Sequence, residues 1–272
     1  MGNSTATPPL PTDFANAVAS YRNTAEQNDF IHQEFTRKTW ADPLLAEHRN
    51  FIEAGHIGFG DPAFHYMWKL LIEHLAPRKR LRLLEIGVYK GQVLSLWALL
   101  LRNLSSNGGI FAISPMKGDP LPASAWKRRL LALFSARFRE RLCNGDFYDD
   151  LDYEHAMQSL FQHFRLDPRM VTLFKGLSTD SSVHAAVAET FFDLIYLDGD
   201  HTYDVVRADL KFYGQRIAIG GYLVTDDSGA SLPGNNFWKG HPSVSRAVDD
   251  WASANFRNVL NCGHNRIFQR VE

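Results

Sequence analysis

The sequence contains few cysteines and no long apolar run. Its two cysteines, Cys143 and Cys262, match no metal-binding spacing and provide no disulfide scaffold, so reduced thiols in a cytoplasmic protein are expected. No stretch reaches 18 consecutive apolar residues, so no membrane-spanning helix is predicted. The first residues lack the basic and apolar segments of a signal peptide.

An excess of charge of either sign is also missing. With 29 Lys and Arg against 30 Asp and Glu, the formal net charge is −1, which excludes a strongly basic chain that binds nucleic acid through bulk charge. The 45% of hydrophobic and 22% of charged residues are ordinary for a globular protein. The 272 residues can form one large domain with an extension.

We divide the chain into an N-terminal arm, residues 1–54, and a main domain, residues 55–272. Three prolines among residues 1–12 predict disorder there. Residues 16–51 show a weak helical pattern with too few aliphatic side chains for a core of their own. We expect this arm to pack on the main domain or on a second subunit, and the second arrangement would make a homodimer.

The main domain alternates short apolar runs with helical patterns and ends in two runs, Phe256–Leu260 and Arg266–Val271, separated by a turn-like segment. This alternation predicts an α/β fold with a Rossmann-like, doubly wound sheet of six or seven strands that ends in a hairpin. An insertion at about 116–145 contains a basic amphipathic helix, Trp126–Leu142. A solvated surface, a lid over the ligand crevice and a membrane-surface helix remain open for it.

A glycine-rich loop, Glu85–Gly91, follows a predicted buried strand and precedes a helix at about Gln92–Leu104. Glycines allow the backbone to approach a ligand, and the helix N-terminus offers free N–H groups. The spacing differs from the G-x-G-x-x-G of dinucleotide sites, which disfavours a dehydrogenase. A tight structural turn is the alternative.

Acidic residues follow two further strands. Leu194–Leu197 runs into Asp198, and Tyr222–Val224 runs into Asp226 and Asp227. Parallel strands end at one edge of a sheet, so these carboxylates should face one crevice and could bind Mg²⁺ or another divalent cation. His201 follows Asp198 by three residues, and its near-neutral pKa suits a general base. Helix caps, loop acids and a structural histidine are the alternatives, and Asp200 is assigned as a cap.

Three segments together resemble a known family. They are L-L-E-I-G-V-Y-K-G-Q at Leu83–Gln92, D-L-I-Y-L-D-G-D-H-T-Y at Asp193–Tyr203 and G-G-Y-L-V-T-D-D at Gly220–Asp227. They look like class I S-adenosylmethionine-dependent methyltransferases, and are most similar to the family-24 type and to metal-dependent O-methyltransferases with macrolide-sugar and catechol-type relatives. The resemblance covers about Gly55–Val271 and implies a seven-stranded sheet with a terminal antiparallel hairpin.

The resemblance also implies roles for individual residues. S-adenosylmethionine is expected to bind with its methionine half at the Glu85–Gly91 loop and its adenine near residues 176–178. Asp198, Asp226 and Asp227 would hold the cation, and His201 would accept a proton from a small hydroxylated acceptor of the sugar or natural-product type. The expected cofactor residues are Glu85, Gly87, Tyr89, Gly91, Ser114, Leu177, Ser178 and Asp198.

One departure from the family concerns the ribose. The family usually has an acid at the end of its second strand, but Phe111–Pro115 contains none. Ser114 and Asp119 are the candidate replacements. Without a replacement, the cofactor would bind more weakly or in another arrangement.

Two other functions are compatible with these residues. A metal-independent N- or O-methyltransferase would use His201 alone, and a non-catalytic nucleotide-binding module would explain the missing ribose acid. Phe59, Phe237 and Trp238 are assigned to packing or to an acceptor pocket. His56, His241 and His264 are expected to be loop residues without a catalytic role.

Overall fold

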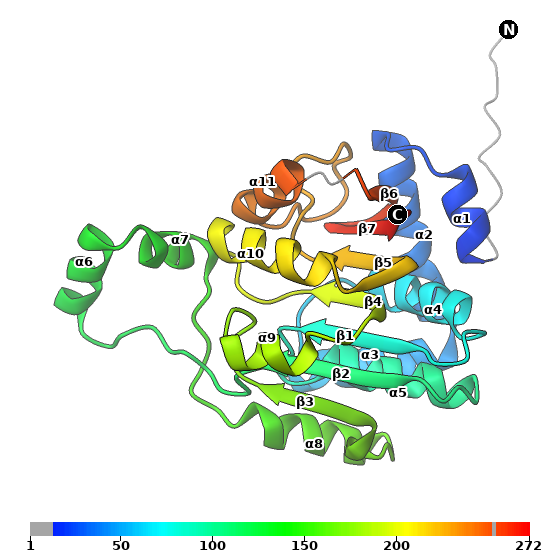
Figure 1. Ribbon diagram of the computed structural model, residues 1–272, viewed down its shortest axis with the longest axis horizontal. Helices are drawn as coiled ribbons and strands as arrows, with labels where there is room; N and C mark the ends of the chain where they lie inside the picture. Colours follow the sequence, from blue (N-terminus) through cyan, green and yellow to red (C-terminus); the bar gives the residue numbers. More distant parts are fainter. Residues whose placement is uncertain (1–12, 252–253) are drawn as a thin grey trace, which may run out of the picture.

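The computed structural model describes residues 13–251 and 254–272. The segment predicted to be disordered, residues 1–12, lies outside the described residues. A seven-stranded sheet with the order β3-β2-β1-β4-β5-β7-β6 forms the centre of the molecule (Figure 1). The strands are β1 (Arg82–Ile86), β2 (Gly109–Ser114), β3 (Val171–Lys175), β4 (Phe192–Leu197), β5 (Ile217–Thr225), β6 (Phe256–Cys262) and β7 (Asn265–Arg270). The first five pair in parallel, and β7 pairs antiparallel with β5 and β6, which confirms the predicted sheet and hairpin.

Helices cover both faces of this sheet. One face carries α4 (Ala63–Leu75), α5 (Gln92–Asn103), α8 (Tyr153–His163) and the N-terminal helices, and the other carries α9 (Ser181–Val187), α10 (Tyr203–Gly214) and α11 (Pro242–Trp251). Successive strand residues point to opposite faces, so Leu83 enters the first core and Leu84 enters the second. Because β1 and β4 are buried on both faces, most of their residues are apolar, and Glu85 is a buried exception in β1.

The N-terminal arm forms α1 (Phe14–Ser20), α2 (Ala25–Ala41) and α3 (Pro43–Gly55) and packs on the main domain. Phe14 lies edge-on against Tyr222 of β5, with ring centroids 5.2 Å apart. Asn261 of β6 donates to the Tyr21 hydroxyl over 2.6 Å. The structure thus shows the first of the two expected arrangements, and a dimer contact stays a prediction.

The insertion after β2 forms two helices where one was predicted. Helix α6 (Ala125–Phe134) ends at Ser135, and α7 (Ala136–Asn144) begins there because the Ser135 hydroxyl accepts from the Phe138 amide. No residue of α6 is buried, and this helix lies outside the layered body of the molecule (Figure 1). Helix α7 lies beside α10, and the Tyr203 amide at the start of α10 donates to Glu140 over 3.1 Å.

A short 3-10 helix, Pro168–Met170, precedes β3. None of the helices in the described part of the chain is long and apolar enough to cross a membrane.

The buried hydroxyl of Tyr21 provides a test of how the arm is attached. It accepts from Asn261 and donates to Asn28 over 2.8 Å. We expect Tyr21→Phe to lower the free energy of unfolding by about 1–3 kcal/mol, since both amide groups lose a buried partner. Denaturant unfolding measures this change. As a matched control, Tyr203→Phe removes a solvent-exposed bond to Asp250 and should change stability by less than about 0.5 kcal/mol. Equal losses of stability in both variants would contradict a stabilising role for the buried Tyr21 hydrogen bonds.

Candidate active site

A cavity of about 740 Å³ lies at the carboxyl edge of the parallel strands. Its lining comes from the segments that follow five strands: Gly87–Tyr89 after β1, Ser114–Pro115 after β2, Gly176–Thr179 after β3, Asp198–His201 after β4 and Asp226–Asp227 after β5. Residues of α7, the β6–β7 turn and the loop at 58–61 complete it. This is the edge at which open α/β sheets bind their ligands.

Gly87 lets the first and fourth strand loops meet. Its φ of 94° lies in the left-handed region, and a Cβ placed there would stand 1.7 Å from the Asp198 carbonyl oxygen. The Gly87 amide also donates to the Ile113 carbonyl of β2 over 3.0 Å. Only glycine permits this approach, which places the glycine loop directly against the acidic residues after β4.

Gly91 has a different position from the other predicted cofactor residues. It precedes α5 with a φ of 88°, and a Cβ there would lie 2.6 Å from Met157 of α8. Gly91 does not line the cavity. Its position favours close packing of two helices, whereas Glu85, Gly87 and Tyr89 reach the cavity.

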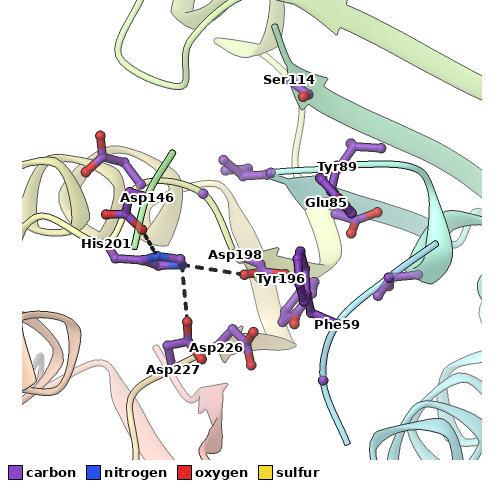
Figure 2. A pocket seen from close by; sticks show the side chains of 18 of the residues that line it. Phe59, Glu85, Tyr89, Ser114, Asp146, Tyr196, Asp198, His201, Asp226 and Asp227 are labelled. Atoms are coloured by element: carbon purple, nitrogen blue, oxygen red, sulfur yellow. Dashed lines mark hydrogen bonds and ion pairs between the residues drawn. The ribbon is translucent and has the colours of Figure 1, made fainter. Parts of the chain in front are cut away.

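Glu85 brings a buried carboxyl group to the cavity wall (Figure 2). Its residue is 1% exposed, and its Oε2 atom has no hydrogen-bond partner. Burial and the nearby carboxylates of Asp198 and Asp226 hold the pKa of Glu85 well above its usual range. A buried acceptor without a partner would be satisfied by a donor group of a ligand, and an ammonium group would suit it best.

The other predicted cofactor residues lie along the loops after β2 and β3. Ser114, Leu177 and Ser178 all line the cavity. The Ser114 hydroxyl accepts from the Met116 amide over 3.2 Å, and the Ser178 hydroxyl donates to buried Asp209 over 2.8 Å. Asp119, the other candidate for the ribose contact, also lines the cavity and is paired with Arg141 over 2.8 Å. Both candidate ribose residues therefore reach the same space.

His201 occupies the centre of an acidic cluster (Figure 2). Its Nδ1 atom lies 2.5 Å from the Asp146 carboxylate, and its Nε2 atom lies 3.2 Å from Asp227 and 4.0 Å from Asp198. Burial alone would lower the pKa of His201, but the hydrogen bond to Asp146 and the nearby carboxylates of Asp198 and Asp227 raise it well above its usual value. The bond at Nδ1 fixes the orientation of the ring and directs Nε2 toward the two other carboxylates.

Asp227 contacts three histidines. Its Oδ2 atom is 3.5 Å from His241 and 3.2 Å from His201, whereas its Oδ1 atom is 3.4 Å from His264. The Asp227 backbone has a φ of 51°, an uncommon conformation for a residue other than glycine. Burial and the Asp226 carboxylate raise the pKa of Asp227 to about 7.

The donor set fits a divalent cation, but the three predicted carboxylates do not form one compact group. The described residues include three groups whose ligand atoms lie within 4.8 Å of one another: Asp146, His201 and His241; Asp198, His201 and Asp227; and Asp226, Asp227 and His264. Burial and Asp226 raise the pKa of Asp198, while the His264 contact lowers the pKa of Asp226 despite its burial. Buried carboxylates whose negative charges disfavour one another when no cation is bound form a suitable site for a divalent cation.

Three further residues of the site are not indicated by the local sequence patterns. Asp146 lies 55 positions before His201 at the end of the insertion, and no local pattern connects the two. His241 and His264 were assigned to loops without a role, yet both contact Asp227. The predicted hairpin is a sequence signal for His264. Because β7 pairs antiparallel with β5, the turn before β7 lies at the edge of the sheet where β5 ends.

The predicted cap also differs in detail. Asp200 accepts from the Thr202 amide over 2.7 Å and pairs with Arg137 of α7 over 2.9 Å, whereas the N-cap position of α10 belongs to Thr202. Asp200 therefore fixes the turn before the helix and attaches the insertion to it.

Comparison with known proteins identifies one family. A family model described as a methyltransferase domain, family 24, matches residues 84–228, which is more than half of the chain. No curated protein sequence matches the chain.

Solved structures show the same fold at low sequence identity. The O-methyltransferase NovP has a TM-score of 0.55 at 16% identity, covering 78% of this chain and 81% of NovP. The O-methyltransferase from Bacillus cereus in complex with SAH has a TM-score of 0.53 at 15% identity, covering 92% and 100%. CalS11, a TDP-rhamnose 3'-O-methyltransferase of calicheamicin biosynthesis, has a TM-score of 0.50 at 14% identity, covering 93% and 98%.

The Asp146–His201 pair predicts a pH-dependent contribution to stability in the metal-free protein. The pKa of His201 is raised in the folded state. Protonation of His201 therefore adds its full contribution to the free energy of unfolding below the ordinary imidazole pKa of about 6.5, and this contribution is lost as the pH rises through the pKa of His201 in the folded protein. Asp146→Asn should therefore lower the free energy of unfolding more at acidic than at alkaline pH. Denaturant unfolding across this range checks the sign. Asp150→Asn, at an exposed position in the same loop, should show no such difference, and a pH-independent loss in Asp146→Asn would contradict the assignment.

Proposed function

Because the chain belongs to methyltransferase family 24, we propose that it transfers a methyl group from S-adenosylmethionine to a hydroxyl group of a small molecule, with the assistance of Mg²⁺ or another divalent cation. The observation that carries this proposal is the contact between Gly87 and Asp198, which joins a glycine loop suited to the cofactor to a cluster of carboxylates and histidines in one cavity.

Cofactor binding is assigned to the side of the cavity formed after β1, β2 and β3. The unpartnered Glu85 carboxyl group would accept from the ammonium group of the methionine half. Ser114 and Asp119 are the candidates for the ribose hydroxyls, and Leu177 and Ser178 would contact the adenine. Leu177 is 51% exposed, so an apolar side chain is available to a bound ring.

The cation site is assigned to Asp198, Asp226 and Asp227. When bound, a dication at these carboxylates would lower the pKa of an acceptor hydroxyl and orient it. These residues must then hold the cation near the cofactor methyl group, since methyl transfer from a sulfonium is an in-line displacement that depends on position.

His201 is assigned as the general base. Its Nδ1 atom is held by Asp146, so the proton of the acceptor hydroxyl would move to Nε2, which lies between Asp198 and Asp227. The positive charge of a nearby dication would disfavour the imidazolium form, and this keeps Nε2 free to accept the proton. Asp146 acts through His201 and is a positioning residue.

The acceptor is assigned to the wall formed by aromatic loop residues. Phe59 is 68% exposed and Trp238 is 56% exposed, and both line the cavity. Phe237 also lines it, but its side chain is buried and packs against His32. Exposed aromatic faces beside a cation site suit a hydroxylated ring, either a sugar or a natural product. Phe237 is better explained by packing.

A metal-independent methyltransferase is the second candidate. It is favoured by the ion pairs of His264 with Asp226 at 3.2 Å and of His201 with Asp227 at 3.2 Å, since these pairs compensate part of the buried negative charge without a cation.

The location and the oligomeric state are further parts of the proposal. The free thiols of Cys143 and Cys262 support a cytoplasmic location, and we propose a homodimer formed through the N-terminal arm.

The Glu85 assignment predicts a loss of cofactor affinity. Glu85→Gln keeps the shape of the side chain but cannot form the carboxylate that would pair with the ligand's ammonium group. S-adenosylhomocysteine should therefore bind about 10- to 100-fold more weakly, as expected for the loss of a hydrogen bond between charged groups. Isothermal titration calorimetry measures the change. Glu189→Gln, at an exposed position in the segment after α9, is the control and should bind normally. Binding that is unchanged in Glu85→Gln would remove Glu85 from the site.

The catalytic assignment predicts dependence on both the cation and His201. Release of S-adenosylhomocysteine is measured with S-adenosylmethionine, Mg²⁺ and a panel of sugars and catechols. Chelation or Asp226→Asn should abolish turnover, and His201→Asn should lower kcat by about 10²- to 10⁴-fold while cofactor binding persists. Turnover that resists the chelator would favour the metal-independent enzyme, and wild-type protein that binds no cofactor would refute methyl transfer.

A further inference from the structure

The turn of the terminal hairpin places a histidine beside the two acids that follow β5. His264 is the second residue of the β6–β7 turn and is 5% exposed. Its Nε2 atom lies 3.2 Å from Asp226 Oδ1 and 3.4 Å from Asp227 Oδ1, and these three atoms form one of the compact groups described above. The predicted partner Asp198 belongs to a different group, with His201 and Asp227.

We propose that His264 is a nitrogen ligand of the cation, together with Asp226 and Asp227, and that the site prefers a transition-series dication such as Mn²⁺, Fe²⁺, Co²⁺ or Zn²⁺ to Mg²⁺. This inference rests on the proposed function, since it requires a cation at the two acids. It adds a ligand from the terminal hairpin and a class of metal.

The distances from His264 Nε2 to the two carboxylate oxygens match those between neighbouring ligands around one ion. With metal–ligand bonds of about 2.1 Å, neighbouring ligand atoms are about 3.0 Å apart in an octahedron and about 3.4 Å apart in a tetrahedron. The observed separations of 3.2 and 3.4 Å fall at these values. Because the ligand atoms of the three residues lie within 4.8 Å of one another, one cation can reach all of them.

The surroundings hold the imidazole of His264 in place. Phe64 packs edge-on at 4.7 Å between ring centroids, and Trp238 packs edge-on at 4.9 Å. The His264 carbonyl accepts from the Ser228 amide over 3.0 Å, which attaches the hairpin turn to the residue next to Asp227. A ligand that is already oriented loses little side-chain entropy when the metal binds.

The arrangement leaves His201 free for its proposed role. The two oxygens of Asp227 face different sides, with Oδ1 toward His264 and Oδ2 toward His201 and His241. A cation held by Asp226, Asp227 and His264 would lie on the Oδ1 side, so the Nε2 atom of His201 can still accept a proton on the other.

The nitrogen ligand determines the preferred metal. Mg²⁺ favours an all-oxygen octahedral environment and retains several waters, whereas imidazole suits first-row transition metals. For an N/O site, affinity rises along the series from Mn²⁺ toward Cu²⁺. Replacement of His264 should therefore weaken transition-metal binding more than Mg²⁺ binding.

Pulsed electron paramagnetic resonance of the full chain loaded with Mn²⁺ tests the coordination directly. We expect the wild type to show the modulation of a directly bound ¹⁴N nucleus and His264→Asn to lose it. Calorimetry should show Mn²⁺ binding weakened at least about tenfold in His264→Asn, as for removal of a metal-site partner, with a smaller change for Mg²⁺. His155→Asn, on the exposed surface of α8, is the matched control and should retain both properties.

The outcomes separate this inference from the proposed function. If the wild type binds Mn²⁺ through Asp226, as shown by loss of binding in Asp226→Asn, but has no ¹⁴N coupling, His264 only donates a hydrogen bond and the inference is wrong, while metal-assisted transfer stands. An absence of ¹⁴N coupling in the wild type overturns the inference even if His264→Asn fails to fold. Coupling in the wild type is in that case assigned to His264 only if it persists in His201→Asn and in His241→Asn, the other histidines near Asp227. Coupling that persists in a folded His264→Asn protein also overturns the inference. A wild type that binds neither cation refutes both.

Discussion

The close approach of β1 and β4 at their carboxyl ends determines the organisation of this protein. The two strands pair in parallel over Leu83–Ile86 and Leu194–Leu197, so the loops that follow them meet. Gly87 makes this meeting physically possible because any side chain there would collide with the Asp198 backbone. The parallel sheet thus brings a glycine loop, suited to the cofactor, against the acids proposed to hold a cation.

The second constraint is the compensation of buried negative charge. Glu85, Asp146, Asp198, Asp226 and Asp227 lie around one cavity. The four aspartates are paired with His201, His241 and His264, whereas the Oε2 atom of Glu85 has no partner. Burial, and after it the neighbouring carboxylates, raise the pKa of Glu85, Asp198 and Asp227, so their charged forms are disfavoured in the protein without ligands. An ammonium group at Glu85 and a dication at the aspartates would stabilise these charged forms. The same arrangement therefore accounts for the proposed binding of both groups.

The sequence predicts local features of this site well and distant contacts poorly. Apolar runs that end in Asp198 and Asp226 identify buried parallel strands and their shared edge, and the Glu85–Gly91 pattern identifies a strand, turn and helix. Asp146 could not be found this way, because it reaches His201 through the path of the insertion and not through any periodic pattern. The break between α6 and α7 was missed because Ser135 interrupts an amphipathic pattern that continues on both sides. The position of His264 in the site depends on the pairing of β7 with β5, a contact between segments about 40 positions apart.

The most direct test of the account is a crystal structure of the protein with S-adenosylhomocysteine and a divalent cation. We expect the methionine half at Glu85, the ribose near Ser114 or Asp119, the adenine at Leu177 and Ser178, and the cation at the acids after β4 and β5. S-adenosylhomocysteine bound outside this cavity, or a cation that contacts none of Asp198, Asp226 and Asp227, would contradict it.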